Sequence, residues 1–131
     1  MKFLLLIYNE PELLEALPSD EFETRMRGCL SHADELQKEG KLLESRMLQG
    51  PATAKSVRIR NGRRTTSDGP FAETKEVLGG FNLIEAADMD EAVRMAAEFP
   101  WARTGCVEVR PLEDVDAMRR RVGAAQSPVQ A

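Results

Sequence analysis

The chain has 131 residues, a formal net charge of −4 and a sequence pI near 5.1. Its composition, 42% hydrophobic and 31% charged residues, is that of one globular domain and excludes a globally disordered chain. The acidic balance is unfavourable for nucleic acid and for anionic membrane surfaces, since both require a concentrated basic surface.

A first strand is predicted at residues 3–8, a continuous apolar run that is typical of a central strand covered on both faces. This run is too short for a secretory signal, and no stretch is long enough to cross a bilayer. Cys29 and Cys106 each lie in an apolar stretch, which predicts buried free thiols in a reducing compartment. We therefore expect a cytoplasmic protein.

Residues 11–17 predict one or two helical turns, ended by Pro18. A longer amphipathic helix should follow, capped by Ser19 or by Asp20, the latter forming a capping box with Glu23. Gly40 is placed to end it. The apolar stripe of this helix, spaced by three and four residues, consists of Phe22, Met26, Cys29, Leu30, Ala33 and Leu36.

A second strand is predicted at residues 41–49, followed by a β-hairpin with strands at 56–60 and 63–67. Asn61-Gly62 indicates the hairpin because both central positions of a two-residue turn require positive φ. The hairpin strands are polar, so we expect them at a sheet edge or standing away from the core. Asp68-Gly69-Pro70 should form a turn.

Residues 72–78 predict a polar, partly helical connector, and Gly79-Gly80 should precede a strand at 81–86. A second capping box, Asp88 with Glu91, begins the next helix. Its predicted inward face consists of Met89, Ala92, Val93, Ala96 and Phe99. Pro100 should end this helix, with a last strand at 106–110, a short helix at 113–122 and a frayed tail at 123–131.

The order of elements predicts a ferredoxin-like α+β fold, βαββαβ, with an inserted β-hairpin. We assign residues 1–112 to the domain and 113–131 to a C-terminal helix and tail. Two helices on one face of an antiparallel sheet leave the other face uncovered. A second copy of the chain, packed sheet against sheet, is the simplest cover, so we expect a homodimer.

The run DGPFAETKE at residues 68–76, followed by Leu78-Gly79-Gly80-Phe81, resembles the signature of DGPF-domain proteins, a branch of the YCII-related family. The apolar start at residues 2–8 and the segments 51–54 and 107–111 fit the same pattern. The resemblance covers roughly residues 1–112.

The resemblance implies a dimeric α+β barrel, as in muconolactone isomerases and several small monooxygenases. In many YCII-type members a His and an Asp face a pocket. The family His would fall near Cys29, whereas the single His of this chain is His32. DGPF members are often associated with extracytoplasmic-function sigma factors, which implies a bacterial regulatory setting and a regulatory protein partner.

Asp68 and His32 are the candidate catalytic residues. Asp68 could act as a general acid or base at the mouth of a pocket, or its carboxylate could cap the turn by accepting backbone N–H groups. His32 lies at the edge of the apolar stripe, where it could shuttle a proton or be a partly exposed helix residue.

Tyr8, Phe71, Glu73 and Lys75 are the candidate substrate-binding residues. Tyr8 could present its hydroxyl to a pocket or form part of a core wall. Phe71 belongs to the signature run, and Glu73 and Lys75 could hold a polar ligand or form a solvated connector. Trp101 should line a cleft or a dimer interface.

No metal or cofactor is expected, because one His and two distant Cys do not provide a set of metal ligands. Two functions remain open. The first is a cofactor-independent lyase or isomerase in which Asp68 moves a proton on a small polar or aromatic substrate. The second is a non-catalytic module that binds a ligand or a partner in bacterial regulation. Fold alone does not decide between them.

Overall fold

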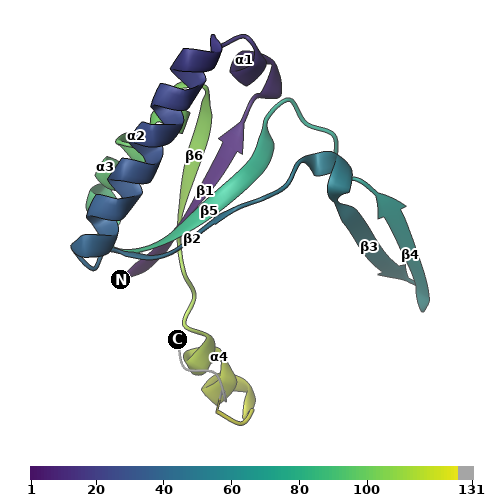
Figure 1. Cartoon of the computed structure of the whole chain (residues 1–131). Coiled ribbons are helices and arrows are strands. Elements are labelled where there is room, and N and C mark those ends of the chain that lie inside the picture. Colours follow the sequence, from purple (N-terminus) through teal and green to yellow (C-terminus); the bar gives the residue numbers. More distant parts are fainter. Residues whose placement is uncertain (127–131) are drawn as a thin grey trace.

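The computed structural model describes residues 1–126. Four strands form one antiparallel sheet in the order β2-β5-β1-β6: β1 (Lys2–Asn9), β2 (Leu42–Met47), β5 (Val77–Glu85) and β6 (Gly105–Pro111). The helices α2 (Ser19–Lys38) and α3 (Met89–Ala97) lie on one face of this sheet (Figure 1). This is the ferredoxin-like arrangement, and the predicted fold class is confirmed.

Short elements complete the chain. The helix α1 (Pro11–Glu15) follows β1, and single 3₁₀ turns occupy Pro51–Thr53 and Pro100–Arg103. The hairpin of β3 (Lys55–Arg60) and β4 (Arg63–Asp68) is inserted between β2 and β5, and α4 (Val115–Val122) follows β6. Within residues 1–126, no helix has the length and hydropathy needed to cross a bilayer.

The core lies between the sheet and the two long helices. Phe3, Leu5 and Ile84 from the central strands are fully buried there, packed with Phe99 after α3. Burial alternates along β1, and its other face is only half-buried. One chain covers only one face of this strand, since both helices lie on the same side, and the cover of the second face by another copy stays a prediction.

Helix α2 begins at Ser19, one residue earlier than a cap at Ser19 would place it and two earlier than a cap at Asp20. Its N-cap is Pro18, whose carbonyl accepts the backbone N–H of Phe22, and no side chain caps it. The predicted cap at Ser19 or Asp20 is wrong, because both residues are already helical. The predicted C-terminal end is confirmed: Gly40 has φ of 72° and the N–H of Lys41 bonds to the carbonyl of Leu36.

Helix α3 begins at the predicted cap, with the Asp88 carboxylate accepting the N–H of Glu91 at 2.8 Å. Its buried face differs in part from the predicted one. Met95 joins Ala92 and Ala96 in the core, whereas Met89 and Val93 are exposed. The buried face is rotated about the helix axis relative to the predicted one, away from Val93 and toward Met95.

Strand β5 begins at Val77, four residues before its predicted start, and no helix precedes it. Gly79 and Gly80 lie inside this strand. A Cβ atom on Gly80 would come within 2.6 Å of the Arg46 carbonyl oxygen in β2, so glycine permits the close approach of these strands. The register of β5 against β1 shifts by one residue between Ile7 and Tyr8, which is a β-bulge.

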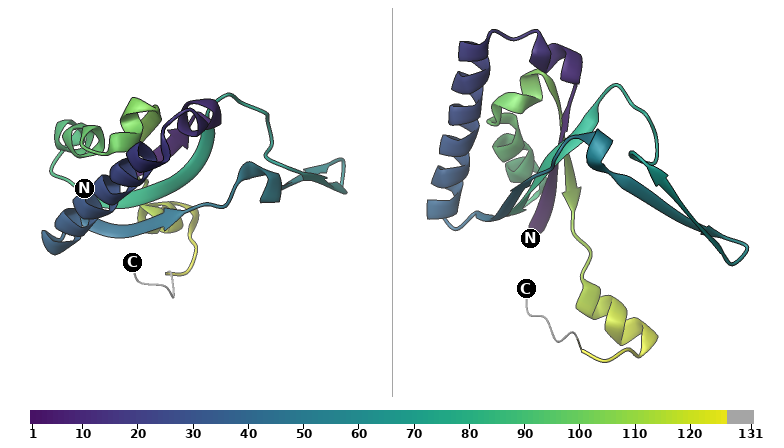
Figure 2. Two further views of the ribbon diagram at one scale, coloured as in Figure 1. Left: turned by 45° about the horizontal axis from the view of Figure 1, so that its top comes forward. Right: turned by 45° about the vertical axis from the view of Figure 1, so that its right-hand side comes forward.

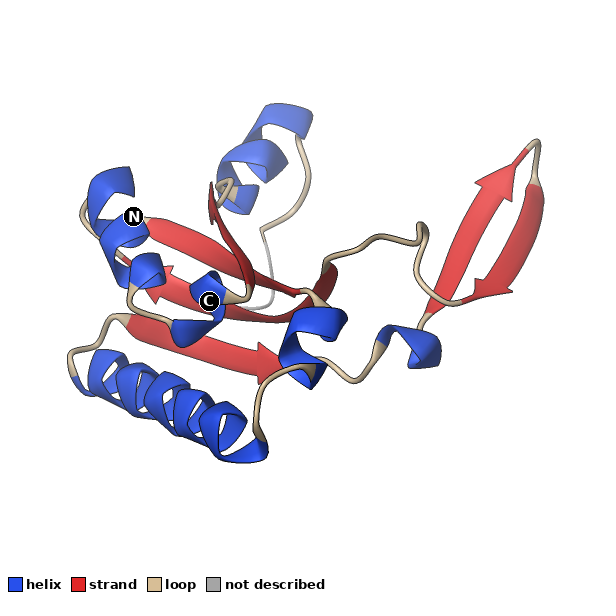
Figure 3. Cartoon of the chain, turned by 90° about the horizontal axis from the view of Figure 1, so that it is seen from above, coloured by secondary structure: helices blue, strands red, loops and turns tan. Residues whose placement is uncertain are grey.

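The predicted hairpin is confirmed, with Asn61 at φ of 54° and Gly62 at φ of 73°. We call residues 55–68 the arm. It forms a separate two-stranded sheet that projects away from the helices and the main sheet (Figures 1 and 3).

Helix α4 also lies apart from the main body (Figures 1 and 2). It is capped by Asp114, and Gly123 ends it in the left-handed conformation. The predicted helix is thus confirmed. Of the predicted frayed tail, residues 127–131 lie outside the described residues, and Ala124 and Ala125 bond to Arg119.

Candidate functional site

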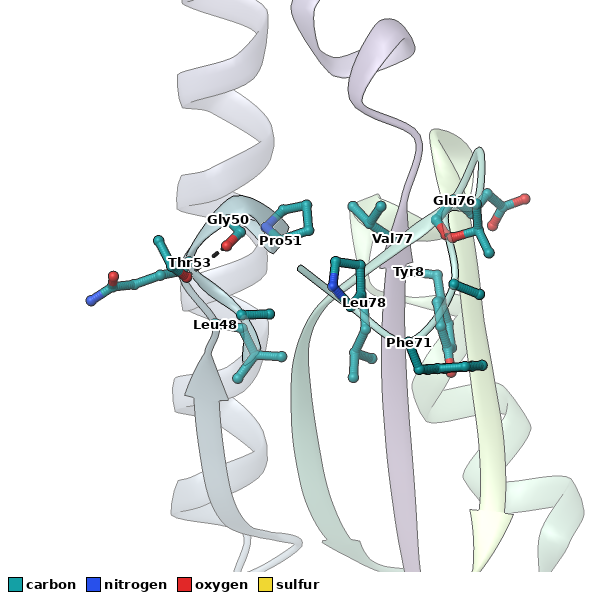
Figure 4. A pocket seen from close by; sticks show the side chains of 14 residues that line it. Tyr8, Leu48, Gly50, Pro51, Thr53, Phe71, Glu76, Val77 and Leu78 are labelled. Carbon is teal, nitrogen blue, oxygen red and sulfur yellow. Dashed lines mark hydrogen bonds between the residues drawn. The ribbon is translucent and has the colours of Figure 1, made fainter. Parts of the chain in front are cut away.

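The largest pocket that we describe has a volume of about 500 Å³ and lies between one end of the sheet and the base of the arm (Figure 4). Four segments form its wall: the end of β1, the loop before the arm, the loop after it and the first residues of β5. Most of its lining is apolar. Its lining residues include Tyr8, Leu48, Pro51, Phe71, Val77 and Leu78.

Tyr8 lies on the face without helices through the alternation of β1, and Leu78 joins it there because of the bulge. The register shift pairs Tyr8 with Leu78 rather than with Gly79. Both side chains therefore point to the face of the sheet that carries no helices. In Figure 4 the Tyr8 hydroxyl is directed toward the ring of Phe71, whose side chain is 80% exposed.

The base of the arm joins the two pocket loops. The N–H of Gly69 donates to the Ala54 carbonyl at 2.7 Å, and the Ser56 hydroxyl donates to the Gly69 carbonyl at 2.8 Å. Gly69 itself has φ of 89°, a conformation that favours glycine. The chain is thereby turned so that Pro70 and Phe71 enter the pocket wall.

Asp68 is the last residue of β4 and is not among the lining residues of the pocket. Its side chain is 83% exposed, and its carboxylate forms an ion pair with the ammonium group of Lys55 on the opposite strand. This lysine, rather than the backbone N–H groups of the turn, is the recorded partner of the carboxylate.

His32 lies on the opposite side of the sheet, between α2 and α3, so the structure does not bring it together with Asp68. Its Nε2 is 3.2 Å from the Met95 carbonyl oxygen, and its Nδ1 is 3.5 Å from Glu98 Oε2. The ring meets Phe99 edge-on, with centroids 4.4 Å apart. With only 10% of its side chain exposed, His32 connects the two helices.

Replacing His32 by alanine should lower the free energy of unfolding by about 1–2 kcal/mol, because both a packed ring and a bond to Met95 are lost. Denaturant unfolding followed by circular dichroism measures this. The neighbouring exposed Ser31→Ala should have no measurable effect. An unchanged unfolding midpoint for His32→Ala would contradict the structural role.

Glu73 and Lys75 are likewise absent from the pocket lining. Lys75 Nζ lies 3.1 Å from Glu10 Oε1, where the glutamate side chain is 15% exposed. This ion pair ties the loop after the arm to the segment after β1. Glu76 is at the pocket edge, and in Figure 4 its carboxylate points away from Val77 and the cavity.

A second cavity of about 210 Å³ lies under α2, and the sequence analysis did not foresee it. Cys29, Trp101 and Asn82 line it, and Asn9 contributes a buried Oδ1 without a hydrogen-bond partner. Burial raises the pKa of the Cys29 thiol, with a hydrogen bond to Trp101 acting in the opposite direction. Asn82 is a buried polar residue in an otherwise apolar strand, and this departure from the apolar pattern is the sequence feature that could have indicated the cavity.

The second cysteine departs from expectation, since Cys106 is exposed on β6 rather than buried. It pairs with Tyr8 across the strands and shares the face without helices. Trp101 is buried and packs on Phe22 with ring centroids 5.7 Å apart. Among residues 1–126, no group of three His, Cys, Asp or Glu side chains is placed to hold a metal ion.

Comparison with known proteins shows the family of the chain, a sequence relative and a similar solved structure. The model of the YCII-related domain matches residues 1–116. An uncharacterized protein of Rhizobium meliloti (strain 1021) is 38% identical over 114 residues, which are 86% of this chain and 92% of that protein.

Among solved structures, the chain is similar to the 5-chloro-2-hydroxyhydroquinone dehydrochlorinase of Burkholderia phenoliruptrix AC1100 in complex with 2,5-dihydroxybenzoquinone. The sequence identity is 17%, the TM-score is 0.48, and the alignment covers 86% of this chain and 94% of that one. A likeness at this level does not indicate the activity of this chain.

Proposed function

The chain belongs to the YCII-related family, and we propose that it binds a small, largely apolar ligand of aromatic type in the pocket at the base of the arm. The volume of about 500 Å³ is in the range of small-molecule sites, which are mostly apolar with few polar groups. The Tyr8 hydroxyl and the Phe71 ring supply one polar group and one stacking surface.

The observation that carries the proposal is the convergence of Tyr8 and Phe71 from distant parts of the chain. We propose binding rather than proton transfer by Asp68, because the exposed Asp68 carboxylate is paired with Lys55 and lies outside the pocket. A regulatory protein partner stays a prediction.

We also propose that the protein is a homodimer through the face of the sheet that carries no helices. The half-buried apolar side chains of this open face are Leu4, Leu6, Phe81 and Leu83. Charged residues on the outer strands flank them, such as Arg46 and Glu108. An apolar centre with a polar rim supports an interface between two copies, and the pocket opens at its margin.

The ligand proposal is tested with 2-naphthol, a neutral hydroxyarene, by isothermal titration calorimetry. Replacing Phe71 by alanine should weaken binding about tenfold, since one stacking surface is removed. The unfolding midpoint should not move, because the Phe71 side chain is mostly exposed.

Asp68→Asn is the matched control, since it changes the neighbouring signature residue without touching the pocket lining. Binding of 2-naphthol should be unaltered in this variant. Equal affinity of wild type and Phe71→Ala for 2-naphthol would contradict the assignment of this pocket. A large loss of affinity in Asp68→Asn would show that Asp68 takes part in ligand binding.

A further inference from the structure

Positive charge is concentrated on the arm. Residues 55–68 contain one lysine and four arginines against one aspartate, a net charge of +4. The whole chain carries −4, so the remaining residues together carry −8. A basic projection on an acidic body is therefore the largest separation of charge in the molecule.

The two faces of the arm differ. The cross-strand register places Val57 and Ile59 on one face, where their side chains are 60% and 63% exposed. The opposite face carries Arg58, Arg60 and Arg63. A two-stranded hairpin is at best marginally stable alone, so an arm with an exposed apolar pair is suited to packing against another surface.

The most one-sided acidic segment of the chain is residues 10–23, with six carboxylates and no lysine or arginine. It covers α1 and the first turn and a half of α2. Among described residues, Glu12, Glu15 and Asp20 are exposed and have no recorded ion pair. The arm of the same chain points away from these helices (Figures 1 and 3).

We propose that the arm of one copy docks on the acidic segment at residues 10–23 of a second copy. This inference rests on the proposed homodimer. The face of the arm that carries Arg58, Arg60 and Arg63 lies against the carboxylates of the partner. In a twofold dimer each contact occurs twice, so each arm lies against the acidic segment of the other copy.

A second copy fits the arm better than a nucleic acid does. The body carries −8 and would repel a polyanion that follows the arm, whereas the same charge attracts the arm of a partner.

The experiment measures the dimer dissociation constant of the full chain by analytical ultracentrifugation at two salt concentrations. Arg58→Glu with Arg63→Glu should weaken the dimer at least about tenfold at low salt. Arg120→Glu with Arg121→Glu on α4 makes the same change in net charge away from the arm, and it should leave the constant within about threefold.

The decisive variant combines Arg58→Glu and Arg63→Glu with Glu12→Lys and Asp20→Lys in one chain. This charge exchange should restore dimerisation to within about threefold of wild type. A dimer unaffected by the arm variant, or a combined variant that stays weak, overturns the inference while the sheet-mediated dimer stands. A monomeric wild type overturns both. Loss of binding to a double-stranded DNA probe in the arm variant, with an unchanged dimer, overturns it in favour of a nucleic-acid surface.

Discussion

A Phe81→Glu substitution should convert the protein from a dimer into a monomer at micromolar concentration. Phe81 lies opposite Leu6 at the centre of the open face. A carboxylate there would be buried twice by twofold symmetry. The basic residue opposite it on β2, Arg46, is already paired with Glu44 at 3.1 Å, and a buried charge without full compensation costs several kcal/mol per site. Light scattering after size exclusion measures the change from twice the chain mass of 14.6 kDa to the mass of one chain.

Val93→Glu is the matched control for that experiment. Val93 is also an exposed apolar residue, but it lies on α3 at the other side of the sheet. This variant should remain dimeric. A Phe81→Glu protein that still elutes as a dimer would exclude the open face as the interface. Any contact between the arm and the acidic segment would then belong to a different arrangement of the two copies.

A Gly80→Ala substitution should reduce the free energy of unfolding by roughly 2–3 kcal/mol. The added Cβ would meet the Arg46 carbonyl oxygen at 2.6 Å, and a backbone atom cannot move aside without separating β2 from β5. Since β2 leads into the loop that forms one pocket wall and supports the arm, ligand binding should weaken as well. For a domain of this size the thermal midpoint should fall by about 10 °C.

Gly28→Ala is the same substitution at another position, and it should raise the free energy of unfolding instead of lowering it. Gly28 lies inside α2, and a Cβ there has only an ordinary contact with the Pro100 ring at 3.6 Å. Alanine in a helix is favoured over glycine by about 0.5–1 kcal/mol, so this variant should be more stable than wild type. Calorimetry of the two variants tests the contrast, and a stable Gly80→Ala protein would show that β2 can shift freely.

The strands and the long helices were predictable because their signals are local. Gly40 ended α2, Asp88 began α3 and Asn61-Gly62 formed the hairpin, each through the conformation of a few consecutive residues. The start of β5 was not predictable in the same way. Glycine is required at residues 79 and 80 because neighbouring strands come too close for a Cβ atom, and such contacts are visible only after the sheet is assembled.

The candidate site was predictable in part. Tyr8 and Phe71 both line the pocket, but Leu48 and Pro51 were missed because only the pairing of β2 with β5 brings them there. The surroundings of Asp68 could have been inferred. Once Asn61-Gly62 fixes the turn, Asp68 and Lys55 are equally far from it, so the hairpin register places them opposite each other.

The strand order has a consequence for synthesis of the protein. β1 pairs only with β5 and β6, and β2 pairs only with β5, so neither has a neighbour until the ribosome has passed residue 85. The nascent chain can form α2 and the arm early, but its apolar first strand must wait, which exposes it to aggregation. Translation that stops before β5 therefore yields a chain without a main sheet, and a fragment ending there would be a substrate for chaperones rather than a folded half-domain.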